Sequence, residues 1–258
     1  MSGTFVVLKR ELKSYFYSPI AYAIIVMFLV ISGYFFYSGM AFFSVASFEM
    51  SRTVGFTGPQ DLEIADFVLR PFFGNIGVIL LLMAPLITMR LFSEEKKTGS
   101  IELLFTWPLR DGELVIGKYL AALIVLIALL VPTMSYLIVI DIYTAVPWGV
   151  LIAGYLGVFL LGSAFIALGL FVSTLTENQI ISSAITFGCL LIFWVIAWTA
   201  AHNTDTFSQV LRYLSILRHQ DDFAKGVIKL SDVVYYLSFI FFFIFLSLRS
   251  LESKKWRG

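Results

Sequence analysis

Charged residues are scarce in this chain, and their scarcity indicates the solvent in which it folds. Asp, Glu, Lys and Arg make up 14% of the 258 residues, and apolar residues make up 59%. Soluble domains carry about 25% charged residues. The apolar residues form continuous runs, without the alternation that membrane β-barrels require. The composition, with a mean hydropathy of +0.91, therefore predicts an all-α polytopic membrane protein.

Cysteine, histidine and net charge are also nearly absent. The single cysteine, Cys189, excludes an intrachain disulfide, and its place in an apolar run predicts a packing role. A net charge of +1 gives no reason to expect a nucleic-acid partner. The two histidines and the aspartates near them show no metal-ligand spacing, so we expect no metal site and interpret them as solvated loop residues: His202, His219, Asp205, Asp221 and Asp222.

Ionisable residues are missing from the middle of every long apolar run. Six runs reach the length of about 20 residues that a membrane helix needs: 20–43, 72–92, 118–140, 149–174, 179–201 and 233–249. Ion-coupled carriers and proton pumps generally use buried ionisable groups, so their absence counts against a gradient-driven carrier, although cation sites made of backbone carbonyls stay possible. No paired nucleophile and base is present either, so we expect no catalytic residue and no enzyme activity.

The distribution of Lys and Arg predicts how the six spans are oriented. If the N-terminus is cytoplasmic, twelve of these residues lie inside and six outside, in agreement with the positive-inside rule. Both termini are then cytoplasmic. The first apolar run is too long for the core of a signal peptide, which has about 7–15 residues, so it is expected to be the first span.

Residues 4–18 have the pattern of an amphipathic helix lying along the inner leaflet. Four apolar residues share one face, and basic residues such as Lys9 decorate the other: Phe5, Leu8, Leu12 and Phe16. Ser18 and Pro19 would end this helix before the first span. The alternative is a positively charged flank without regular structure; the spacing favours the interfacial helix, which could also contact a cytoplasmic partner.

Two further segments leave alternatives open. The connection 202–232 contains two stretches with helical spacing, which predict an outer helical hairpin that either lids the bundle or forms a folded surface loop. The fourth span is rich in small residues, with Ala153 and Gly157 four apart, as are Ser163 and Ala167. Such spacing permits close helix contact, either inside the bundle or at a dimer face.

The most informative segment is a charged island, residues 94–108, between the second and third runs. Ser100 can cap a short helix that Pro108 would end, with Ile101, Leu104 and Phe105 on one face. A loop lying on lipid is the simpler interpretation, but three acidic residues fit poorly beside an anionic leaflet: Glu94, Glu95 and Glu102. A helix that docks into a groove of a partner protein fits better.

A nearby motif, Gly112 to Lys118, matches the phosphate-binding pattern G-x-x-x-x-G-K. Tyr119 stands where that pattern needs a magnesium-binding Ser or Thr, and no strand precedes it. We interpret the match as chance and expect Asp111 to cap the helix of the third span, with Glu113 in its first turn. The chain is therefore not expected to hydrolyse ATP.

Residues 90–120 resemble the segment after the second span of ABC-2-type transporter permeases. The positions that match the family's pattern are Glu94, Glu95, Lys96, Lys97, Gly99, Ser100, Ile101, Glu102, Leu103, Leu104, Pro108, Gly117 and Lys118. Residues 8–19 are similar to the family's N-terminal connecting helix. The resemblance extends over all six spans and is nearest to the permeases first named for gliding motility.

This resemblance implies a permease of type V exporter-like architecture in the cell (inner or plasma) membrane, with the direction of transport left open. Two permease halves, self or paralogue, would each dock one ABC ATPase subunit through the 94–108 coupling segment, at Glu94, Glu95, Gly99, Ser100, Ile101, Glu102, Leu104, Phe105 and Pro108. ATP and Mg would bind that partner, with no cofactor on this chain, and an outer accessory protein could join. Alternatives are a gradient-driven carrier or channel, and a membrane scaffold that transmits ATPase-driven force without transport.

Overall fold

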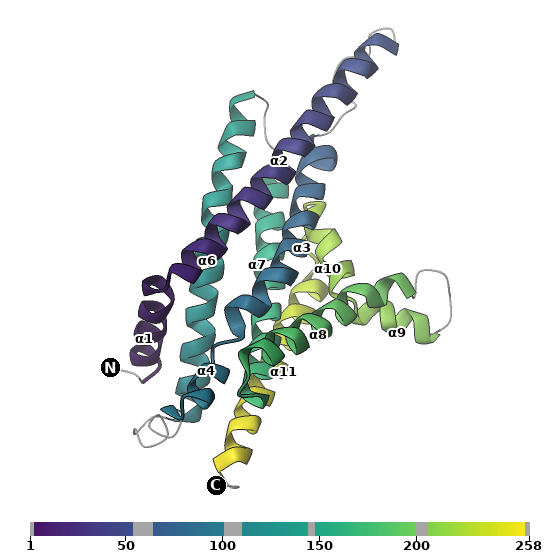
Figure 1. The fold of residues 1–258 in the computed structure, drawn as a ribbon. Helices are drawn as coiled ribbons and strands as arrows, with labels where there is room; N and C mark the ends of the chain where they lie inside the picture. Colours follow the sequence, from purple (N-terminus) through teal and green to yellow (C-terminus); the bar gives the residue numbers. More distant parts are fainter. Residues whose placement is uncertain (1–2, 54–63, 101–109, 144–147, 200–205, 256–258) are drawn as a thin grey trace.

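The computed structural model describes residues 3–53, 64–100, 110–143, 148–199 and 206–255, and all regular structure in these ranges is helical (Figure 1). The elements, in chain order, are α1 (Gly3–Tyr17), α2 (Pro19–Thr53), the π-helical turn η2 (Ala65–Leu69), α3 (Arg70–Thr88), α4 (Ser93–Lys97), α6 (Asp111–Tyr143), α7 (Trp148–Leu175), α8 (Gln179–Thr199), α9 (Thr206–Leu214), α10 (Ile216–Ala224) and α11 (Leu230–Lys255).

Six of these helices are long and apolar enough to cross a membrane, which confirms the expected number of spans. Several exceed the expected bounds, because helix continues where apolar sequence stops. The clearest case is α2, which has 35 residues against the 24 of the run 20–43. At 1.5 Å per residue it is about 52 Å long, so it extends well beyond a hydrocarbon core of about 30 Å.

The central element is α7, which packs against α3, α6, α8, α10 and α11. In an apolar stretch of 18 residues of α7, 83% of the residues are buried, whereas at most 22% are buried in the corresponding stretches of α2, α8 and α11. Its sequence explains this position, since a helix that is apolar on all sides belongs in the interior. The hydrophobic core therefore surrounds α7, while α2, α8 and α11 leave most of their apolar surface uncovered in the monomer.

Small residues on α7 serve close packing within the chain. An added Cβ at Gly157 would lie 2.4 Å from the Cβ of Phe223 in α10, and one at Gly169 would lie 2.1 Å from Thr88 Oγ1 in α3. Of the two alternatives that the sequence leaves open for this span, the structure shows packing inside the bundle.

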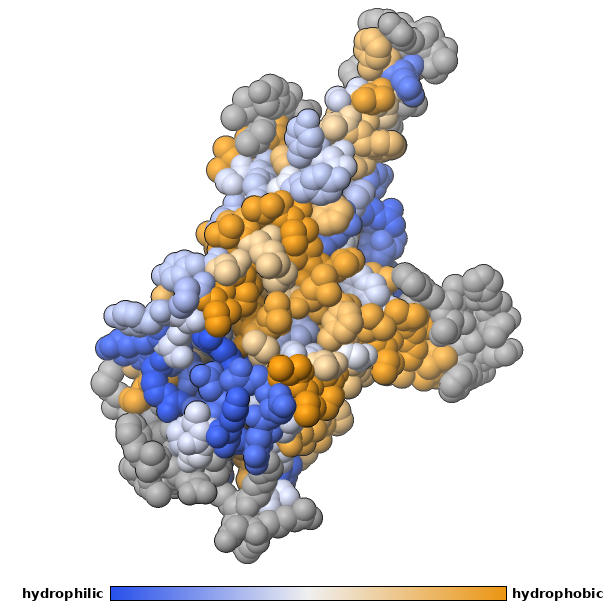
Figure 2. All heavy atoms as spheres, viewed as in Figure 1, coloured by the Kyte–Doolittle hydropathy of each residue, from blue (hydrophilic) through white to orange (hydrophobic). Residues whose placement is uncertain are grey.

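The two ends of the bundle differ in character. Both chain ends lie at the same end of the bundle, together with α1 and α4 (Figure 1). Figure 2 shows hydrophilic side chains gathered over that end, beside a broad hydrophobic surface across the middle. Two short helices, α9 and α10, lie where the sequence indicates a helical hairpin; α10 covers α7, α3 and α8, and α9 packs on α8.

A first prediction tests the contact between α7 and α10. We expect Gly157→Ala to destabilise the protein by about 1–3 kcal/mol, because the Cβ of Phe223 is tied to the α10 backbone and cannot rotate away. The measurement is the midpoint of thermal unfolding in detergent. Gly188→Ala in α8 is the control, since no atom lies within 4 Å of its added Cβ; equal midpoints for the two variants would contradict the close contact.

Candidate functional site

The charged island starts from a short helix, α4, that is fixed to the end of α7. The hydroxyl of Ser93 donates to the carbonyl of Ser173 at 3.2 Å, and the ammonium of Lys96 donates to the carbonyl of Thr174. Ser93 is fully buried and Lys96 is 9% exposed. Because the last turn of a helix has free carbonyls, α7 supplies acceptors at the place where α4 needs them.

After α4 the chain turns sharply. Gly99 has φ = +71°, a conformation that favours glycine, and the hydroxyl of Thr98 donates to the carbonyl of Glu94 at 3.0 Å. The hydroxyl of Ser100 lies 3.4 Å from the carbonyl of Glu95 and thus closes the same turn. The docking face expected from Ile101, Glu102, Leu104, Phe105 and Pro108 lies outside the described residues, so the structure describes the root of the coupling segment and not its tip.

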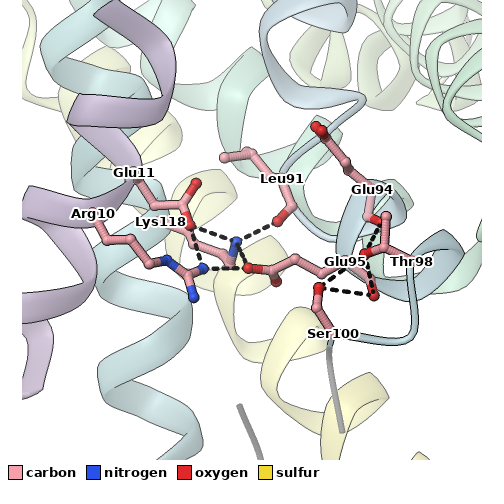
Figure 3. A network of polar contacts seen from close by, with 8 residues as sticks. All are labelled: Arg10, Glu11, Leu91, Glu94, Glu95, Thr98, Ser100 and Lys118. Atoms are coloured by element: carbon pink, nitrogen blue, oxygen red, sulfur yellow. Dashed lines mark hydrogen bonds and ion pairs between the residues drawn. The ribbon is translucent and has the colours of Figure 1, made fainter. Parts of the chain in front are cut away.

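The root is joined to two other helices by the ammonium of Lys118 in α6 (Figure 3). This ammonium lies 2.9 Å from Glu11 Oε1 of α1 and 3.0 Å from Glu95 Oε1 of α4. It also donates to the carbonyl of Leu91 at 2.5 Å. Lys118 is only 1% exposed, so three elements distant in sequence converge on one buried charge.

A second cation completes the cluster, which we call the joint: Arg10, Glu11, Glu95 and Lys118. The guanidinium of Arg10 donates to Glu11 Oε1 at 2.6 Å and also contacts Glu95 Oε1. Two cations thus face two carboxylates, which gives a neutral group. Such balance matters because a buried charge without a counter-ion is strongly unfavourable.

The electrostatics of the joint are visible in the pKa of Glu11. Burial alone would raise this pKa, but the charge of Lys118 and hydrogen bonds from Arg10 and Lys118 outweigh burial. The pKa of Glu11 therefore lies below its usual value of 4.5, and the carboxylate stays ionised at neutral pH.

Helix α1 is docked into the bundle through a face that sequence analysis did not identify. Its buried residues are Val7, Glu11 and Tyr15, and the Tyr15 hydroxyl donates to the carbonyl of Ile87 at 2.7 Å. The apolar residues expected to face lipid stay partly accessible: Phe5 at 48% exposure, and Leu8, Leu12 and Phe16 at intermediate exposure, with Lys9 exposed. One face of α1 is thus packed against α6, and another stays accessible.

Gly117 and Lys118, which end the G-x-x-x-x-G-K pattern, have structural roles in the contact between α1 and α6. An added Cβ at Gly117 would lie 2.8 Å from the Cβ of Val7, so glycine lets α1 approach α6, and Lys118 then reaches Glu11. Asp111 is the first residue of α6, and Glu113 in its first turn accepts a hydrogen bond from the backbone N–H of Arg110 at 3.1 Å.

The structure corrects one expectation on the opposite side of the bundle. His219, interpreted from sequence as a solvated loop residue, is 3% exposed and contacts Asp232. Within the described ranges, no group of three or more His, Cys, Asp or Glu side chains could hold a metal ion.

Comparison with known proteins gives one family. The family model described as "ABC-2 family transporter protein" matches residues 5–254, nearly the whole chain. No curated protein matches the chain.

A second prediction tests the joint. Lys118→Met leaves the carboxylates of Glu11 and Glu95 buried with less counter-charge, so we expect a loss of about 3–5 kcal/mol in unfolding free energy. Hydrogen exchange should also become faster in α1. Arg249→Met is the matched control, because it removes an exposed ion pair with Glu252 that is worth about 0–1 kcal/mol. Equal effects of the two changes would contradict the structural role of Lys118.

A third prediction concerns acid. Because the pKa of Glu11 is lower in the folded protein than in the unfolded chain, its ionised carboxylate stabilises the fold. This stabilisation is complete above the pKa of the unfolded chain, 4.5, and is lost as the pH falls through the pKa of the folded protein. Hydrogen-exchange protection of α1, corrected for intrinsic rates, should therefore be equal at about pH 7 and 5 and should fall near pH 3. Glu11→Gln should show weaker protection and a smaller acid step. Loss of protection already between pH 7 and 5 would refute this assignment.

Proposed function

The chain belongs to the ABC-2 family of transporter proteins, and is thus a membrane permease subunit of an ABC transporter, and from this premise we propose that a separate ATPase subunit drives it. Members of the family generally pair with an ABC ATPase and form dimers. We propose two ATPase copies for two permease halves, one docked on each coupling segment, residues 94–108.

The observation that carries the proposal is the anchoring of that segment's root. Ser93 and Lys96 fix α4 to the end of α7, and Glu95 shares Lys118 with α1. A displacement applied beyond Ser100 would therefore reach α1, α6 and α7 together, with little room for α4 to move alone. Packed elements with charged contacts are the physical means by which a binding event changes a distant equilibrium.

The same joint supports an external motor. Lys118, the lysine of the phosphate-binding pattern, is committed to two carboxylates and a carbonyl in the bundle. We therefore propose that this chain binds neither ATP nor Mg, that both belong to the partner, and that the chain has no ATPase activity of its own. The ion-coupled alternative is less well supported, because the buried charged groups of the described spans lie near helix ends.

The membrane setting follows from the same reasoning. The chain is a multi-pass membrane protein. We propose that it lies in the cell membrane with both termini, α1 and the coupling segment on the cytoplasmic side, where an ATPase can reach them. Membership of the gliding-motility-type subgroup is a narrower proposal, which rests on the general sequence pattern of the chain over its six spans.

A fourth prediction tests the docking. The paired change Leu104→Asp with Phe105→Asp should weaken binding of the ATPase at least 100-fold and so remove it on co-purification, because two apolar side chains lose about 1.5–3 kcal/mol of burial each. Glu102→Arg should weaken binding through charge reversal. The control is Val227→Asp with Ile228→Asp, two exposed apolar residues beside α10. Recovery of the ATPase at wild-type level from the doubled 104/105 variant would end the proposal.

A further inference from the structure

His219 of α10 is buried between two hydrogen-bond acceptors. Its Nδ1 lies 2.6 Å from Oδ1 of Asp232, in the first turn of α11, and its Nε2 lies 2.9 Å from the carbonyl oxygen of Tyr213 in α9. His219 is 3% exposed and Asp232 is 4% exposed. One imidazole ring therefore connects three helices on the side of the molecule opposite the joint.

The chemistry of these two acceptors determines how many protons the His219 ring and the Asp232 carboxylate hold between them. A backbone carbonyl can only accept, so Nε2 must carry a hydrogen. A neutral imidazole has one N–H, which leaves only a lone pair on Nδ1 to face a carboxylate oxygen 2.6 Å away. That contact is a hydrogen bond only if a proton lies between the two atoms. We propose that His219 and Asp232 form a proton-binding site whose bound proton latches α9 and α10 to α11.

The surroundings stabilise the protonated, neutral pair over a bare carboxylate. The second oxygen of Asp232 is buried and has no hydrogen-bond partner among the described residues. A carboxylate in that position is costly unless a cation or a proton offsets its charge. The ring of Tyr235 stacks on the imidazole at 4.0 Å between centroids, and Tyr213 meets its edge at 5.2 Å. The stacked Tyr235 ring favours an imidazolium through cation–π attraction.

The other charged groups near the pair are either in ion pairs of their own or exposed. Asp221 binds Arg70 of α3 and Lys225, and Asp222 binds Lys229. Arg218 is exposed, and α7 and α8, which pack on α10, carry no charged residue.

The nearby hydroxyl groups are also engaged. The hydroxyl of Tyr235 donates to the carbonyl of Leu214, and that of Tyr236 donates to the carbonyl of Ile216. Ser231 Oγ lies 3.4 Å from Asp232 Oδ1. Among these groups, none is placed to supply the proton between His219 and Asp232.

The consequence is a linkage between proton binding and closure of this junction. The closed arrangement binds one proton more than an open one, in which His219 and Asp232 are solvated apart. Above about pH 6.5, the usual value for a solvated histidine, the open junction no longer holds this proton, so opening releases it and the equilibrium constant for opening rises by up to tenfold for each pH unit. Because Phe223 of the same helix lies against Gly157, opening would release the contact of α10 with α7.

The test is hydrogen exchange of residues 213–224 in the purified full-length protein, measured from about pH 5 to 9 and corrected for intrinsic rates. In the wild type, the opening constant should rise toward a slope of tenfold per pH unit. In Asp232→Asn the opening constant should not rise with pH, because the amide donates to Nδ1 of a neutral ring and closes the junction without the extra proton. Asp222→Asn, which loses only its exposed ion pair with Lys229, should keep the wild-type slope.

Two results would overturn the inference: a flat wild-type profile over this range, or a wild-type slope in Asp232→Asn. His219→Gln gives a second reading that does not depend on the folding of the first variant. It has no titrating ring and should be flat, so a wild-type slope in that variant would place the titration elsewhere. The measurement needs no ATPase, and its outcome is therefore separate from that of the proposed function.

Discussion

The end of the bundle that holds both termini, α1 and α4 depends on the buried ammonium of Lys118. It contacts Glu11 of the N-terminal helix, Glu95 of α4 and the carbonyl of Leu91 at the end of the second span, while Arg10 balances the remaining charge. Each carboxylate is tolerated in the interior only because the cations are there. The position of α1, the root of the coupling segment and the start of α6 are therefore set by one electrostatic constraint.

Helix α7 connects that constraint to the rest of the molecule. Near its C-terminal end the carbonyls of Ser173 and Thr174 accept hydrogen bonds from α4, and at Gly157 it packs against Phe223 of α10. These contact points are about 25 Å apart along the helix. Because α7 is packed against five neighbouring helices between these points, a displacement at one of its ends cannot easily be absorbed by local rearrangement.

Much of this architecture follows from the sequence. Long apolar runs with charges at their ends predict six spans, and the spacing of Phe5, Leu8, Leu12 and Phe16 predicts a helix at residues 4–18, where α1 is found. The sequence also predicts that the island after the second span docks an ATPase, and that role stays a prediction.

The partners inside the joint could not be predicted, since pattern analysis treats charge as a sign of exposure. Glu11 and Lys118 are 107 residues apart, and neither has a local neighbour that indicates burial. His219 was misjudged for the same reason, because its partner Asp232 lies beyond a turn and in another helix. Gly117 beside Lys118 is the one retrospective signal: a glycine within a helix that would otherwise favour a larger residue often marks a close contact.

The most direct test of the central claim is a double-mutant cycle between Glu95 and Lys118. Unfolding free energies would be measured for Glu95→Gln, Lys118→Met and the pair in the same detergent. If Lys118 is the shared counter-ion of the joint, the double variant is less destabilised than the sum of the single variants, by about 1 kcal/mol or more. Additive effects would show that α4 does not depend on this lysine, and the account of the joint would be wrong.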